Sequence, residues 1–139
     1  VDTETGAIAL LAHTAVDDCG VVLQPVFVEG QQHGGSVAGV SQALFEHVAY
    51  DPDGNPLTSS LLDYLLPSAA EVPFIDTDTM STPTERNVLG TRGIGENGCN
   101  GATAAAHNAV LDALSPYGVE HLDLPLTPER VWAACLPAR

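Results

Sequence analysis

Segment 90–101 constrains this chain more than any other, because five of its twelve residues are glycine. Glycine allows positive φ and lets another group approach the backbone to contact distance. Glu96 is the only acid of the segment and stands just before a stretch whose alanines recur at helical spacing. The pattern predicts a tight loop that holds one carboxylate near the positive end of a helix dipole. That placement suits catalysis, and it equally suits a purely electrostatic role for Glu96.

The length of 139 residues and the hydrophobic fraction of 45% predict one folded domain over residues 1–139. Mixed strand and helix patterns make the fold class α+β, a single unit of short strands packed with about three helices. The expected elements, in chain order, are a strand at 7–16, a turn at 17–20, a helix from 25 or 30 to 47, a hairpin at 49–57, a buried helical or irregular segment at 61–66, a strand at 74–80, a loop at 81–89, and helices at 100–114 and 128–135.

The last of these helices has the clearest local signal. Thr127 is a good N-cap and Pro128 fits the first helical position, where its missing N–H costs nothing. Leu126 is placed to pack against Val131 as a hydrophobic staple. A short helix ending near Cys135 is therefore predicted.

A second glycine-rich stretch lies inside the expected first helix, at positions 30, 34, 35 and 39. Each glycine costs a helix about 0.5–1 kcal/mol relative to alanine. Either a ligand or a closely crossing helix would explain them, and the sequence leaves both open. Gln31, Gln32 and His33 stand among these glycines and suit hydrogen bonding to a polar heterocycle. No second ligand follows His33 at i+4, so we assign no metal ligand.

Residues 93–98 spell G-x-G-x-x-G, the pattern of a dinucleotide-binding turn. That turn requires a buried strand running into its first glycine, whereas residues 83–89 have loop chemistry. Glu96 would also place a negative charge beside a pyrophosphate. We therefore reject a Rossmann site.

The formal charge of −14, from 18 acids against four arginines, argues against nucleic acid and anionic membranes as partners. The three cysteines are widely spaced, without a Cys-x-x-Cys pair, which predicts a reduced, cytoplasmic protein. No apolar run approaches the roughly 18 residues of a membrane span.

Three segments in order, 16–20, 28–46 and 90–96, resemble the molybdenum hydroxylases, the family of xanthine dehydrogenase, aldehyde oxidoreductase and aerobic carbon monoxide dehydrogenase. Segments 62–67 and 124–132 also look like the C-terminal end of that family's large subunit. The resemblance spans nearly the whole chain. It implies that residues 1–139 are the C-terminal molybdopterin-binding portion of a several-fold longer subunit.

The resemblance also implies roles for single residues. Glu96 matches the glutamate of the family's Gly-x-Gly-Glu turn, which stands next to the metal and acts as general base in a reaction whose oxygen comes from water. Gln31 matches a glutamine that hydrogen-bonds the pterin. Gly34 and Gly35 would give the cofactor access to backbone, and Gly93 and Gly95 would clear space at the metal site.

The cofactor so implied is a molybdenum pyranopterin, in bacterial members commonly molybdopterin cytosine dinucleotide. A 2Fe-2S centre and FAD would lie on other domains or subunits of an oligomer, and the remainder of the large subunit would be a further partner. The small-molecule substrate would be an aldehyde, an N-heterocycle or carbon monoxide. The isolated chain would be inactive. Gln24, Asn97 and Cys99 depart from the family pattern, and a non-catalytic structural or assembly domain with the same fold is the alternative.

Overall fold

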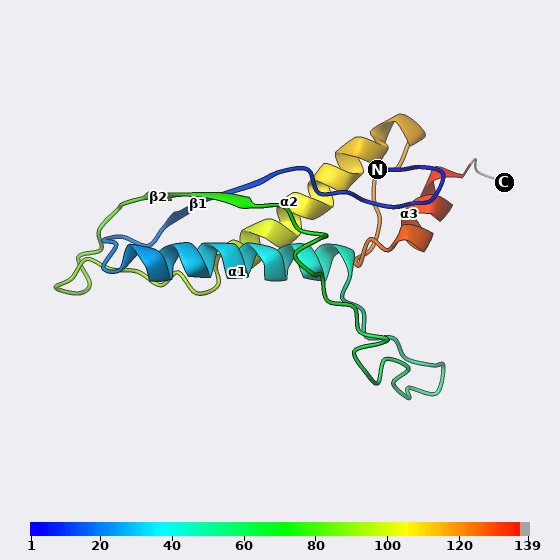
Figure 1. The fold of residues 1–139 in the computed structure, drawn as a ribbon, viewed down its shortest axis with the longest axis horizontal. Helices are drawn as coiled ribbons and strands as arrows, with labels where there is room; N and C mark the ends of the chain where they lie inside the picture. Colours follow the sequence, from blue (N-terminus) through cyan, green and yellow to red (C-terminus); the bar gives the residue numbers. More distant parts are fainter. Residues whose placement is uncertain (137–139) are drawn as a thin grey trace.

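A computed structural model describes residues 1–136 and has the expected α+β composition. The elements, in chain order, are β1 (His13–Asp18), α1 (Pro25–Leu44), β2 (Ile75–Met80), α2 (Asn97–Leu114), the short 3₁₀ helix η1 (Ser115–Tyr117) and α3 (Pro128–Cys135). Figure 1 shows the two strands running beside α1, with α2 crossing α1 obliquely and α3 at the far end of the core.

The two strands form a parallel pair, in register from His13 opposite Ile75 to Asp18 opposite Met80. The strand expected from residue 7 therefore begins later, because β2 offers no partner before Ile75. Ile8 and Leu10 instead pack against the core. The end of the strand also differs from the prediction, since residues 17 and 18 pair with β2 instead of forming a turn.

The crossing of α1 and α2 depends on glycine. A Cβ atom on Gly39 would lie 2.5 Å from the carbonyl oxygen of Cys99, and one on Gly98 would lie 2.9 Å from the Ser36 nitrogen. Real Cβ atoms do not approach backbone so closely, so no larger residue fits this spacing. The same packing explains why α2 begins at Asn97, three residues earlier than its loop-like sequence predicts.

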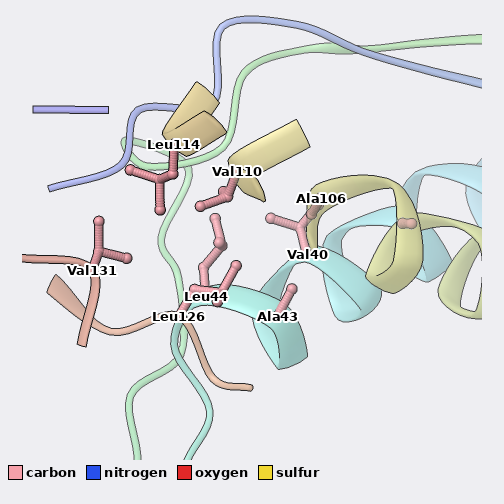
Figure 2. Close-up of a cluster of buried hydrophobic side chains, with 9 residues drawn as sticks. Val40, Ala43, Leu44, Ala106, Val110, Leu114, Leu126 and Val131 are labelled. Atoms are coloured by element: carbon pink, nitrogen blue, oxygen red, sulfur yellow. The ribbon is translucent and has the colours of Figure 1, made fainter. Parts of the chain in front are cut away.

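The hydrophobic core lies at the C-terminal half of α1 (Figure 2). It joins α1, α2 and the segment around α3 through Val40, Ala43, Leu44, Ala102, Ala106, Val110, Leu114, Leu126 and Val131. The predicted start of α3 is confirmed: the Thr127 hydroxyl accepts a hydrogen bond from the Arg130 amide at 3.5 Å. Leu126 and Val131 are both buried, as the staple requires.

Residues 46–74, which we call the arm, project from the body at the lower right of Figure 1. The expected hairpin is reduced to one antiparallel bridge between Tyr50 and Pro56. The expectation that segment 61–66 is buried is wrong, because its four leucines are 54–90% exposed. The Tyr64 hydroxyl donates a hydrogen bond to the Glu46 carboxylate and ties the arm to its own base.

Among residues 1–136, no helix has the length and apolar character needed to cross a membrane.

Candidate functional site

The structure brings Gln31 next to the glycine-rich loop. Gln31 lies on an exposed face of α1 and lines a cleft of about 290 Å³ together with Thr91, Arg92 and Ile94. A Cβ atom on Gly95 would lie 3.6 Å from the Gln31 Oε1 atom. Segments far apart in sequence thus meet at one concave surface, with Gly95 immediately preceding Glu96.

A short backbone pairing holds the loop in this position. Arg92 donates its amide to the Cys19 carbonyl at 2.7 Å, and Val21 donates its amide to the Gly90 carbonyl at 3.0 Å. Gly20 has a φ of +68°, and a Cβ atom there would lie 2.2 Å from the Gly90 oxygen. The residues after β1 are therefore shaped to receive the loop, which in turn places it beside α1.

Asp18, the last residue of β1, connects the backbone after β1 to the backbone after β2. Its carboxylate accepts hydrogen bonds from the Thr82 amide at 3.0 Å and the Gly20 amide at 2.8 Å. These bonds, those from Thr82 foremost, together with a smaller contribution from the charge of Arg92, lower the pKa of Asp18 from 3.8 to about 2. The Asp18 carboxylate thus caps the backbone that follows β1.

Glu96 is exposed and is the residue that precedes α2. Its carbonyl accepts a hydrogen bond from the Asn100 amide at 3.1 Å, while its side chain makes no capping hydrogen bond. The carboxylate is thus not used to close the helix start. Its side chain does not line the cleft of Gln31.

The glycines named as cofactor contacts have different surroundings. A Cβ atom on Gly34 or Gly93 would meet nothing within 4 Å, so both leave open space. Gly35 instead lies against α2, where a Cβ atom would be 3.0 Å from the Cys99 nitrogen. The close crossing alone explains Gly35, and its role in cofactor binding stays a prediction.

Gln31, Gln32 and His33 do not face one common site, because successive side chains of an α-helix point about 100° apart around its axis. Gln32 is 2% exposed and its amide donates to the Asp17 carboxylate at 3.0 Å and the Asp78 carbonyl at 2.8 Å. His33 Nε2 lies 3.0 Å from the Ile75 carbonyl oxygen. These two side chains fasten α1 to the strands, and only Gln31 faces the cleft.

Within residues 1–136, no three His, Cys, Asp or Glu side chains come close enough to hold a metal ion. The exposed face of α1 and the loop before α2 offer the Gln31 amide, open backbone at Gly34 and Gly93, and the Glu96 carboxylate, which does not cap the helix. Such a set suits hydrogen bonding to a polar ligand and proton transfer beside it.

Comparison with known proteins gives a consistent result. Residues 1–73 match the family described as molybdopterin cofactor-binding domain. The nicotine 6-hydroxylase large subunit of Paenarthrobacter nicotinovorans is 44% identical over 131 residues, covering 94% of this chain and 16% of that subunit. The carbon monoxide dehydrogenase large chain of Hydrogenophaga pseudoflava is 39% identical, with 95% of this chain and 16% of that chain covered.

Solved structures agree. Reconstituted carbon monoxide dehydrogenase from Oligotropha carboxidovorans matches with a TM-score of 0.93 and 34% identity, covering 96% of this chain and 17% of that one. Quinoline 2-oxidoreductase from Pseudomonas putida 86 matches with a TM-score of 0.86 and 38% identity, covering 89% and 16%. The chain spans about a sixth of the length of the relatives it matches.

Proposed function

The chain belongs to the molybdopterin cofactor-binding family and corresponds to part of a molybdenum hydroxylase large subunit, and from that premise we propose that it supplies the general base, Glu96, and a cofactor contact, Gln31. The observation that supports this best is the 3.6 Å approach of the Gly95 Cβ position to Gln31 Oε1. This contact places Gly95, the residue before Glu96, beside the Gln31 amide, which would bind the pterin.

The residues present fit the cofactor. A pterin carries its metal on its own sulfur atoms, so the protein must supply hydrogen bonds and clearance more than metal ligands. Gln31 is exposed and lines the cleft, whereas the amide of the neighbouring Gln32 is used by two hydrogen bonds to the strands. Gly34, in the same helix as Gln31, and Gly93, in the loop before Glu96, both border open space. Gln31, Gly34, Gly93 and Gly95 would hold and clear the cofactor, with Gly35 contributing backbone.

In the proposed reaction, the Glu96 carboxylate would accept the proton of a water-derived nucleophile whose oxygen bonds to the carbon of an aldehyde, an N-heterocycle or carbon monoxide. The aldehyde or heterocycle gives up the hydrogen of its C–H bond, and each substrate gives up two electrons. A general base of this kind contributes about 10²–10⁴-fold to a rate. When bound, the molybdenum cofactor supplies the two-electron acceptor. The 2Fe-2S centre and FAD on other domains or subunits would carry the electrons onward.

The test is Glu96→Gln in the intact enzyme. This change keeps the size of the side chain and removes its basicity, so turnover should fall by at least about a hundredfold at unchanged molybdenum content. Glu120→Gln is the matched control, because Glu120 is exposed, forms no ion pair within residues 1–136, and lies after α2, outside the residues that line the cleft. The Glu120→Gln variant should keep turnover at the wild-type level when it is measured with the substrate used for Glu96→Gln.

Near-normal turnover in Glu96→Gln, with molybdenum retained, would remove the catalytic role and favour a structural or assembly domain.

The form of the cofactor has a separate test. Acid hydrolysis of the purified enzyme should release CMP if the pterin is the cytosine dinucleotide, and no nucleotide if it is the simple pterin phosphate.

A further inference from the structure

A separate pocket of about 480 Å³ lies beside the cleft of Gln31 and has an unusual lining. It is formed by Thr84, Arg86, Asn87, Thr91 and Arg92. Every one of these side chains can donate a hydrogen bond, and none is acidic or apolar. The chain as a whole carries 18 acids and a formal charge of −14. The pocket is lined by two of the four arginines and by no carboxylate. Its lining is therefore positively charged, although the chain as a whole is strongly negative.

The backbone amides of Arg86 and Arg92 donate hydrogen bonds, whereas the guanidinium groups of these two arginines form no ion pair within residues 1–136. Arg130 donates to the carbonyl oxygens of residues 123, 124 and 125 and so has a structural role. Arg92 is near enough to Asp18 to lower its pKa slightly, yet it forms no salt bridge with that carboxylate.

The wall of the pocket is held by other groups. Asn87 Oδ1 accepts hydrogen bonds from the amides of Leu89, at 3.1 Å, and Thr91, at 3.2 Å. The Asn87 amide nitrogen donates to the Thr91 carbonyl at 2.9 Å. Thr84 Oγ1 accepts from the Arg86 amide at 3.3 Å. The loop is thus shaped without help from the guanidinium groups, which stay available for a ligand.

We propose that this pocket is a binding site for a phosphate-type oxyanion. Guanidinium groups bind phosphate oxygens through two parallel hydrogen bonds, and two of them in one pocket balance about two negative charges. Arg92 also lines the cleft of Gln31, so the anion would stand at the end of that cleft. The phosphate belongs either to the proposed cofactor or to a separate phosphate-bearing small molecule.

The test uses the large subunit in cofactor-free and cofactor-loaded form, titrated with pyrophosphate in a calorimeter at fixed ionic strength. We expect binding to the cofactor-free form that Arg86→Gln and Arg92→Gln each weaken at least about tenfold. Arg86→Lys should weaken it less, because the charge remains. If the cofactor's own phosphate occupies the site, the loaded form will not bind pyrophosphate. If the site is separate, both forms will bind.

Arg130→Gln is the control, since it removes the same charge in α3, at a described position that does not line the pocket, and it should leave the affinity unchanged. Three results would overturn the proposal: no binding to either form, equal weakening by Arg130→Gln, or equal affinity for succinate. Because Glu96 is not part of this pocket, the outcome is independent of the Glu96→Gln test. Loss of one proposal would leave the other standing.

Discussion

Gly39 and Gly34 lie little more than one turn apart on α1, and their surroundings are opposite. A Cβ atom on Gly39 would lie 2.5 Å from a backbone oxygen of α2, whereas one on Gly34 would meet nothing within 4 Å. The fold requires the first glycine. The second only weakens the helix, as far as residues 1–136 show. Glycines that packing already explains carry little information on function, and those left in open space carry more.

The most severe test of this contrast is Gly39→Ala. The added methyl group would overlap backbone of α2, which cannot shift without separating the helices, so the chain should lose about 3 kcal/mol of unfolding free energy. Denaturant unfolding measures the change. Gly101→Ala, in α2 and in open space, is the control and should not destabilise. Wild-type stability in Gly39→Ala would mean that the helices cross at a larger distance.

Gln32 and Gln31 show the same contrast between a residue that the fold uses and one that it leaves exposed. Gln32→Ala removes two buried hydrogen bonds, one of them to the Asp17 carboxylate, and should cost about 2–3 kcal/mol of unfolding free energy. Gln31→Ala should change the same quantity by less than about 0.5 kcal/mol. In the intact enzyme we expect it to lower the molybdenum content per subunit. Equal stability losses in the two variants would contradict the assignment of Gln32 as the fastening side chain.

Gly34→Ala and Gly30→Ala separate helix propensity from ligand access. Both positions lie in α1 with open space around them, so each substitution should raise the unfolding free energy by about 0.5–1 kcal/mol. Only Gly34→Ala should lower the molybdenum content of the intact enzyme, measured by elemental analysis. Full molybdenum in both variants would remove Gly34 from the cofactor site.

The smallest expected effect concerns the turn that receives the loop. The pKa of Asp18 is lowered from 3.8 to about 2 in the folded chain, so its carboxylate stabilises the fold at every pH above 3.8. That contribution is lost as the pH falls through 2. Asp18→Asn should therefore flatten the dependence of the melting temperature on pH between about 4 and 2. An unchanged pH profile would show that these hydrogen bonds do not favour the charged form.

The sequence predicted best where the signal was local. Thr127 and Pro128 define the start of α3 without any distant partner, and the structure confirms it. The beginning of α2 was predicted too late, because Gly98 and its neighbours resemble a loop until α1 packs against them. The burial of the leucines at 61–66 was overestimated, since apolar composition alone does not reveal what covers a segment.

The site was less accessible to prediction from the residues alone. Gln31, Gln32 and His33 look like one polar group, and only helix rotation together with the position of the strands shows which of them faces the cleft. The approach of Gln31 to Gly95 depends on the antiparallel backbone pairing of residues 19–21 with residues 90–92, which lie far apart in the sequence and which no local pattern encodes. The glycine-rich loop directed attention to Glu96, and the family resemblance implied its role, which stays a prediction. The pocket of Arg86 and Arg92 was not predicted, although the scarcity of basic residues was a usable signal.

The two halves of α1 are fastened by different forces. Its C-terminal half sits in the apolar core, while its N-terminal half is held to the strands by the amide of Gln32 and the ring of His33. Water competes with polar bonds of this kind, so amide hydrogens in β1 and the first turns of α1 should exchange sooner than those around Val40. Arrival of a cofactor could then reshape one end of the molecule while the other end stays folded.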